Sequence, residues 1–178
     1  MPGPVFLKGE QVRLNPVEEE DLAFLLECIN DPRVRRGIAS YRPTNREQEA
    51  EWFEGIAESD DEEHFLLTAA GDRAGIVGLH DVDEVFGNAE IGYYVHPEHW
   101  GNGYATDAVR QVAAYAFEER RLHRVSAKCF ADNDASRRVL EKVGFEREGT
   151  LREGAFVRGE YVDLYQYGLL EDEWDGRP

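Results

Sequence analysis

The sequence predicts a mixed fold of the α/β (α+β) class, with a mostly antiparallel central sheet of about seven strands flanked by about four helices. Two observations support this prediction. Three consecutive alternating segments between residues 64 and 95 are joined by short turns, which makes an antiparallel meander. A strand–helix–strand crossover between residues 89 and 130 then adds a strand that is parallel to the last of them if the two are neighbours. The sheet is therefore expected to be mixed.

The chain has 178 residues, the length of one ordinary domain and enough for a hydrophobic core. It contains no internal repeat and no linker. We therefore predict a single domain over residues 1–178, with a core of residues 5–170 and a charged tail over residues 171–178 whose end frays.

The first segment, residues 5–14, alternates loosely and is predicted to be an edge strand. Asn15 as the cap and Pro16 at the first helical position indicate that a helix begins directly after it. Asp31-Pro32 should end this helix, because the residue before a proline avoids the helical conformation.

A polar, irregular segment rich in arginine follows at residues 33–42. Thr44 and Glu47 have the spacing of a second capping box, in front of a helix that carries Trp52. Two helices on one side of the sheet would form a wall of any cleft. The arginines between them either pair with the acidic surface or meet a substrate carboxylate.

The second half is predicted to be mostly strands, with two helices between them. A helix from Ala105 has apolar residues at helical spacing, and a shorter helix begins with Asn133 as its cap and ends at Gly144. The predicted strands are residues 64–70, 73–82, 89–95, 123–130, 145–152 and 161–170.

The stretch from Ile91 to Ala105 is a strand that stops at His96-Pro97, turns, and opens a helix at Gly101-Asn102-Gly103. The first amides of a helix lack internal partners, and the helix dipole adds positive charge there. Glycines let a phosphate approach this backbone, so the motif indicates a phosphate-bearing ligand. The alternative is a glycine-rich turn that only lets strand and helix pack closely. The residues match neither a P-loop nor a dinucleotide fingerprint.

The composition is strongly acidic, with 37 acidic and 20 basic residues and a net charge of −17. This balance argues against a protein that binds nucleic acid or an anionic membrane. It suits a cationic substrate, but the acid is spread along the whole chain, and the only lysines are Lys8, Lys128 and Lys142. We therefore favour adaptation to high salt, a halophilic surface, over substrate attraction.

Cys28 and Cys129 lie in different segments without metal-ligand spacing, so we expect two buried, reduced thiols in a cytoplasmic protein. His96 and His99 flank Pro97 in a turn and lack partner ligands, so we predict no metal. The sequence has no signal peptide and no apolar run long enough to span a bilayer.

Two motifs at their mutual distance carry a family resemblance. They are W-G-N-G-Y-A-T-D-A from Trp100 and N-D-A-S-R-R-V-L-E-K-V-G-F from Asn133, followed by R-E-G…Y-V-D-L-Y-Q-Y-G-L-L-E-D-E-W near the end. Over nearly the whole chain the sequence resembles the GCN5-related N-acetyltransferases (GNAT), most closely the Rim-type enzymes that acetylate ribosomal-protein N-termini. Trp100 stands where the wider family has Gln or Arg, and tryptophan is usual in the Rim-type branch.

The resemblance implies the GNAT fold and acetyl-coenzyme A (acetyl-CoA) as co-substrate. The strand before the motif would splay from its parallel neighbour, and main-chain groups of Tyr94 and Val95 would pair with the pantetheine arm. The Val95 amide could also stabilise the oxyanion of a tetrahedral intermediate. Asn133 would hold the coenzyme with its amide. The cofactor-binding residues implied by the resemblance also include Trp100, Gly101, Asn102, Gly103, Tyr104, Ala105 and Thr106, and the amides from Gly101 to Thr106 would hold the pyrophosphate.

Acetyl transfer to an amine needs a base for the amine and can use an acid for the departing thiolate. Many family members use a tyrosine as the acid, and its position is occupied here by Leu140. We predict that Ser136 substitutes for it, the alternative being a serine that only caps backbone. Glu153 and Glu90 are the candidate bases, with Glu153 fitting the Rim-type branch better. Either one could instead be a plain surface carboxylate.

Three functions stay open at this stage. The first is direct acetyl transfer to a protein N-terminal α-amine. The second is transfer to a small amine such as a polyamine, amino sugar or toxin. The third is a coenzyme A-binding sensor without catalysis. We expect an amine acceptor as partner, no nucleic acid and no membrane, and a monomer or homodimer.

Overall fold

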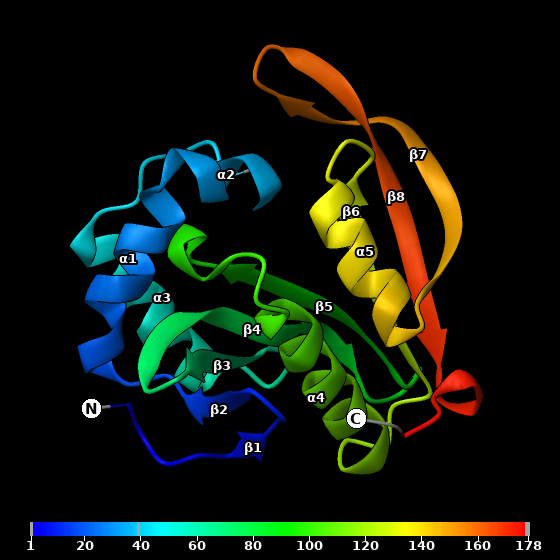
Figure 1. The fold of residues 1–178 in the computed structure, drawn as a ribbon, viewed down its shortest axis with the longest axis horizontal. Helices are drawn as coiled ribbons and strands as arrows, with labels where there is room; N and C mark the ends of the chain where they lie inside the picture. The colour runs from blue at the N-terminus through cyan, green and yellow to red at the C-terminus, as the bar shows by residue number, and fades with distance from the viewer. Residues whose placement is uncertain (1, 39, 177–178) are drawn as a thin grey trace.

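The computed structural model describes residues 2–38 and 40–176, and it contains one eight-stranded sheet with helices on both faces (Figure 1). The strand order is β1-β2-β3-β4-β5-β6-β8-β7. In chain order the strands and α-helices are β1 (Leu7–Lys8), β2 (Val12–Pro16), α1 (Leu22–Asn30), α2 (Pro32–Ile38), α3 (Arg46–Glu58), β3 (Glu63–Ala69), β4 (Asp72–Asp83), β5 (Asn88–Val95), α4 (Tyr104–Glu118), β6 (Arg124–Phe130), α5 (Asp134–Val143), β7 (Glu146–Val157) and β8 (Glu160–Leu170).

The predicted mixed sheet is confirmed, because every neighbouring pair is antiparallel except β5 and β6. There are eight strands instead of about seven because residues 5–14 do not form one strand. The chain turns back at Gly9, whose amide donates to the Val12 carbonyl at 3.0 Å, and so makes the β1–β2 hairpin.

The parallel pair is short and then opens. β5 pairs with β6 only from Asn88 to Glu90, opposite Arg124 to Ser126. Beyond this point β5 stays with β4, whereas β6 pairs with β8 along its whole length. The predicted splay is therefore present, and it leaves one edge of β5 without a strand partner from residue 91 onward.

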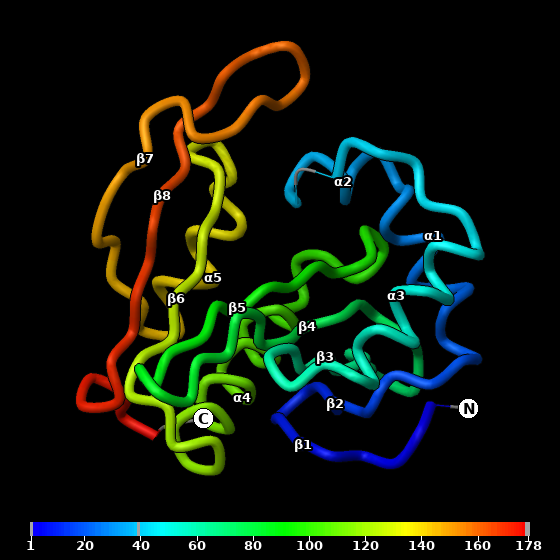
Figure 2. Tube along the Cα trace, turned by 180° about the vertical axis from the view of Figure 1, so that it is seen from behind, coloured from blue at the N-terminus to red at the C-terminus, as the bar shows by residue number. Residues whose placement is uncertain are grey.

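Helices α4 and α5 cover one face of the sheet, and α1 and α3 pack on the other (Figures 1 and 2). The predicted apolar face of α4 is buried from Ala108 to Ala116. Gly144 is left-handed at φ 112°, and the amide of Phe145 donates to the Leu140 carbonyl at 3.0 Å, as the predicted helix ending requires. Phe145 is buried.

Asn15 is not a helix cap, which corrects the sequence prediction. It lies in β2, buried, where its side-chain amide donates to the Gly3 carbonyl at 2.6 Å and its oxygen accepts the Thr68 hydroxyl at 3.1 Å. The strand therefore continues through Pro16, and a 3-10 turn over Glu19–Asp21 leads into α1. An asparagine before a proline suits a cap, but the buried hydrogen-bond partners decide its position.

Two further corrections concern the wall of the cleft. The segment after Asp31-Pro32 is helix α2, because Pro32 occupies a first-turn position and the Asp31 carboxylate accepts the Arg33 amide at 2.7 Å. The capping box of α3 uses Asn45 and Gln48 in place of Thr44 and Glu47. Thr44 instead exchanges hydrogen bonds with the Asn30 side chain at the end of α1.

The end of the chain is more ordered than expected. Glu171–Glu173 forms a 3-10 turn, and the Trp174 ring lies 6.0 Å from that of Phe117. Residues 177 and 178 of the predicted tail lie outside the described residues. Within the part of the chain that the structure covers, no helix combines the length and the apolar character needed to cross a membrane.

Asp107 ties the N-terminal hairpin to α4. Its buried carboxylate accepts the amides of Gln11 at 2.7 Å and Val12 at 3.1 Å. Asp107→Ala should lower the free energy of unfolding by about 3 kcal/mol, because buried amides then lose a charged acceptor. Urea denaturation measures this change. Asp107→Asn keeps one oxygen and is expected to lose clearly less, and equal stability of Asp107→Ala and the parent would contradict this role.

Candidate active site

A cavity of about 640 Å³ lies between the open end of β5, α2 and the N-termini of α4 and α5. Its lining includes residues of α2 and Arg158 of the turn between β7 and β8, and these two elements lie on opposite sides of the end of β5 (Figures 1 and 2). Most of the coenzyme residues predicted from the sequence line it. They are Tyr94, Val95, Trp100, Gly101, Gly103, Tyr104, Ala105, Thr106 and Asn133. Asn102 does not, since its side-chain amide donates to the His99 carbonyl at 3.0 Å.

The N-terminus of α4 presents free amides to this cavity. Gly103 caps the helix at φ 84°, and Gly101 is at φ 80°, conformations that cost other residues about 1–2 kcal/mol. Asp107 makes the first hydrogen bond within the helix, to the Gly103 carbonyl. The amides of Tyr104, Ala105 and Thr106 therefore have no acceptor inside the helix, and together with the dipole they suit an anionic group.

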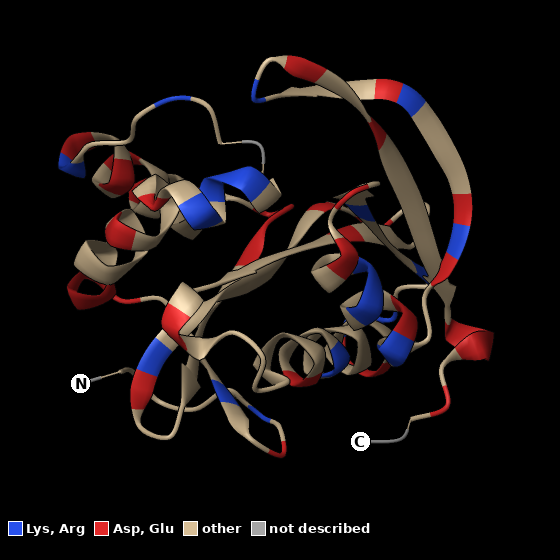
Figure 3. Cartoon of the chain, turned by 45° about the horizontal axis from the view of Figure 1, so that its top comes forward, with Lys and Arg blue, Asp and Glu red and all other residues tan. Residues whose placement is uncertain are grey.

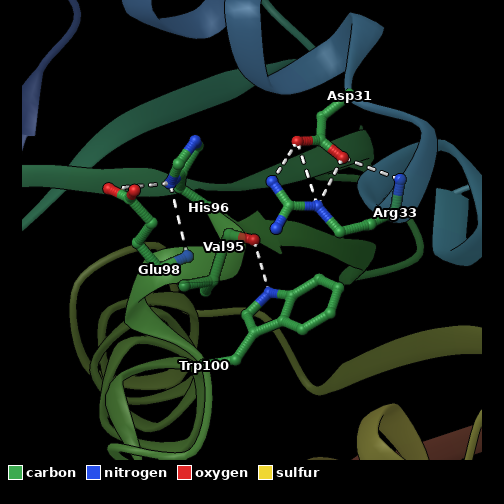
Figure 4. A network of polar contacts seen from close by, with 6 residues as sticks. All are labelled: Asp31, Arg33, Val95, His96, Glu98 and Trp100. Carbon is green, nitrogen blue, oxygen red and sulfur yellow. Dashed lines mark hydrogen bonds and ion pairs between the residues drawn. The ribbon is translucent and has the colours of Figure 1, made fainter.

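The strand edge facing the opening is also free. The His96 amide donates to Ala74 of β4 at 2.8 Å, and backbone groups of alternate residues point to opposite edges of a strand. The amides and carbonyls of Tyr93 and Val95 therefore face the split, whereas those of Tyr94, which were predicted to pair with the pantetheine arm, face β4. The Trp100 indole donates to the Val95 carbonyl at 2.7 Å, and this hydrogen bond ties the end of β5 to the turn (Figure 4). The Val95 amide stays available to a ligand.

Basic residues gather around this cavity although the chain carries a net charge of −17. Figure 3 shows them on α2, on α5 and at the hairpin tip. Guanidinium and ammonium groups bind phosphates, and their convergence on one cavity points to a polyanionic ligand. The basic lining residues are Arg33, Arg36, Arg138, Lys142 and Arg158.

Sequence reasoning left two roles open for the arginines of residues 33–42, and the structure shows the first of them, pairing with a carboxylate of the chain. Arg33 is hydrogen-bonded to Asp31 at 2.6 Å (Figure 4), and this bond lowers the pKa of the Asp31 carboxyl to about 2. Arg33 and Arg36 also line the cavity. The group of arginines is visible in the sequence, but their position on the cavity wall depends on α2 being a helix beside the split.

Ser136 lies in the cavity wall in the first turn of α5. Its amide donates to the Asn133 side chain at 3.1 Å, so Asn133 caps this helix as expected. Its hydroxyl is 2.8 Å from the hydroxyl of Tyr93, which comes from β5. Burial raises the pKa of Tyr93, so that this phenol stays protonated at neutral pH. Leu140, one turn further along α5, is fully buried in the core.

The two predicted bases lie away from this cavity wall. Glu90 is bonded to Lys128 and stands at the last paired position of β5 and β6. Glu153 is exposed in a bulge of β7 at φ 51°, and its amide donates to Asp163 at 2.8 Å. Neither residue is among those that line the cavity with Ser136. Their assignment as bases stays a prediction.

A second cavity of about 540 Å³ lies on the other side of β5, against α1 and α3. Ile38, Tyr93 and Tyr94 line both cavities, so the two meet at the split. Glu49 and Trp52 of α3 also line the second cavity. Glu49 is 5% exposed, and burial raises the pKa of its carboxyl. Sequence reasoning missed Glu49, because a glutamate early in a helix is usually solvated.

The two cysteines are buried, whereas His64 and His80 line a cavity and His96 packs against an aromatic ring. Cys28 and Cys129 are buried and not disulfide-bonded, and burial raises their pKa values to about 12 and 11, which makes them unreactive. His64 and His80 line the second cavity, whereas His96 contacts Phe24 at 5.9 Å between ring centroids.

Among the described residues, Glu62, His64 and His80 bring metal-ligand atoms within 4.8 Å of one another. Glu62 already accepts a hydrogen bond from His64 at 2.9 Å, an arrangement that needs no ion. The predicted absence of a metal stays a prediction.

Comparison with known proteins identifies the family. The model of the acetyltransferase (GNAT) domain matches residues 11–146. The chain belongs to the GNAT family.

Relatives of this GNAT protein have been named for two kinds of acceptor. The Bacillus subtilis protein "Putative ribosomal N-acetyltransferase YdaF" is 35% identical, over 94% of this chain and 96% of its own. The spermidine N(1)-acetyltransferase of Escherichia coli K12 is 27% identical, over 93% of this chain and 89% of its own. The spermidine N-acetyltransferase of Vibrio cholerae, solved with CoA and spermine, has a TM-score of 0.86 at 24% identity, covering 92% and 97% of the two chains.

The protein is therefore an acetyl-CoA-dependent N-acetyltransferase. Its basic cavity fits the co-substrate, because the α4 amides and the arginines suit the phosphates and the free edge of β5 suits an amide-bearing arm.

Proposed function

We propose that this GNAT protein acetylates the N-terminal α-amine of a protein, by direct attack of the amine on acetyl-CoA. One observation carries the direct attack: the coenzyme cavity and the second cavity share Ile38, Tyr93 and Tyr94, so an amine in the second cavity can meet the thioester at the split. The 35% identical relative named "Putative ribosomal N-acetyltransferase YdaF" supports this acceptor.

In the proposed mechanism the Val95 amide, which faces the split, donates to the oxyanion that forms when the amine attacks the carbonyl. The Ser136 hydroxyl gives its proton to the departing thiolate and regains one from solvent, directly or through Tyr93, which is itself reprotonated by solvent. A carboxylate, Glu153 or Glu90, draws the proton from the amine directly or through water. The Trp100 hydrogen bond positions Val95 for this role.

A small amine is the second candidate acceptor. The second cavity contains a buried carboxylate, Glu49, and a 27% identical relative is a spermidine acetyltransferase. A sensor that binds coenzyme A without turnover is a third function, and it requires that no acceptor be acetylated.

A thiol-release assay distinguishes these functions. Peptides with free N-termini, polyamines and amino sugars are offered with acetyl-CoA in high salt, with and without EDTA. Release with peptides alone would support the N-terminal acceptor, and release with small amines alone would replace it with the second candidate. No release despite tight coenzyme binding would leave the sensor. Loss of activity in EDTA would contradict the metal-free prediction.

Glu153→Gln should confine activity to high pH, where the amine is already neutral, because the base is lost. The measurement is a pH–rate profile beside the parent. Glu90→Gln is the matched comparison, since it removes the other candidate carboxylate. If Glu90→Gln changes the profile and Glu153→Gln does not, the base lies on β5 instead of β7.

The protein is also proposed to work in a salt-rich cytoplasm, where both thiols stay reduced. Its net charge is −17, and at low ionic strength the acidic side chains should repel one another over about 10 Å or more. The Tm should therefore rise steeply between dilute and molar potassium chloride, as measured by thermal denaturation. A Tm that does not change with salt would contradict haloadaptation. Attraction of a cationic acceptor would then explain the acidic composition.

A further inference from the structure

Glu49 is a largely buried residue that lines the second cavity without a counter-charge. Its residue is 5% exposed and lines the cavity, and its pKa is raised by burial. Among residues 2–38 and 40–176, its side chain makes no hydrogen bond and no ion pair. Its charge contributes to the raised pKa values of Cys28 and Tyr94. Buried carboxylates are normally paired, so this one indicates a site that a ligand completes.

The rest of the cavity suits a cation. Within the described residues its lining contains no lysine or arginine, in contrast to the coenzyme cavity. Trp52 and Tyr94 supply aromatic surface, which attracts a cation and also packs on methylene groups. Burial lowers the pKa of His64, so this imidazole is neutral at pH 7 and does not repel a bound ammonium.

The position of Glu49 separates it from the reacting amine. It lines the second cavity but not the coenzyme cavity, whereas the thioester must lie where both cavities meet. Tyr94 reaches from the split to the neighbourhood of Glu49. An ammonium paired with a carboxylate also stays protonated, and a protonated amine cannot attack. Glu49 therefore suits a cationic group of the acceptor other than the amine that receives the acetyl group.

We propose that Glu49 binds a second cationic group of the acceptor, so that the preferred substrates are amines that carry another positive charge a few bonds away. Small diamines and polyamines have this chemistry, and so does a peptide whose first residue is lysine. The inference rests on the proposed transfer to an amine that enters through the second cavity.

The test compares matched acceptors in the parent and in Glu49→Gln, which keeps the shape and removes the charge. The pairs are 1,4-diaminobutane against 1-aminobutane, and a peptide that begins with lysine against one that begins with norleucine. In the parent, kcat/KM should favour the dication in one or both pairs by about 10- to 100-fold, the value of one charged hydrogen bond. In Glu49→Gln this preference should fall to about onefold.

Glu47→Gln is the control, because it removes the same charge from an exposed position of α3, and it should keep the preference. The Tm of Glu49→Gln should equal or exceed that of the parent, since an unpaired buried charge destabilises the fold.

The pair of acceptors that shows the preference distinguishes a small amine from a peptide as the substrate. A parent without preference in either pair, or a Glu49→Gln variant that keeps it, overturns the inference while amine acetylation stands. No turnover of any amine overturns the proposed function itself.

Discussion

Replacing Gly103 with valine should raise the Kd of acetyl-CoA by about 10- to 100-fold while the protein stays folded. Gly103 is left-handed at φ 84° directly before the free amides of α4, and it lines the coenzyme cavity. A branched side chain both strains this backbone and occupies the space that a phosphate approaches. Loss of even one charged hydrogen bond to the phosphate accounts for a change of this size. Calorimetric titration with the coenzyme measures it.

The control is Gly71→Val. Gly71 has a similar conformation, at φ 94°, in the β3–β4 turn, and no atom lies within 4 Å of where its side chain would begin. This variant should lose as much stability as Gly103→Val but bind the coenzyme like the parent. An unchanged Kd in a folded Gly103→Val variant would contradict the pyrophosphate site at α4 and leave Gly101-Asn102-Gly103 as a packing turn.

The coenzyme site was predictable from the sequence because it depends on local backbone. A strand end, two glycines and a helix N-terminus are adjacent in the chain, and their free amides follow from helix geometry alone. The splayed strands came from family resemblance, since sequence periodicity does not reveal where two strands part.

The second cavity could not be predicted in the same way. Glu49 resembles any solvated glutamate in sequence, and its burial depends on how α1, α3 and β4 pack together. Asn15 shows the same limit: its local pattern indicates a cap, but partners at Gly3 and Thr68 place it in a strand. Long-range contacts decide the role of polar residues that local chemistry leaves ambiguous.

The role of Ser136 is the strongest test of the proposed chemistry. Ser136→Ala should lower kcat by about 10²-fold and leave the Kd of acetyl-CoA unchanged, the lower end of the range for a general acid. A thiol with a pKa of about 8.5 needs only modest help to leave, which limits the effect. The fold should survive, because the Asn133 cap binds the amide of residue 136 and not its hydroxyl.

Two comparison variants separate catalysis from packing. Tyr93→Phe removes the hydroxyl that lies 2.8 Å from Ser136, and it should lower kcat less than Ser136→Ala, because the serine keeps its own proton. Ser126→Ala is the matched control: this serine contacts the Ala89 carbonyl at the paired end of β5 and β6, outside the coenzyme cavity. It should turn over like the parent. If Ser136→Ala also turns over normally at every pH, the serine belongs only to the first turn of α5, and water protonates the thiolate.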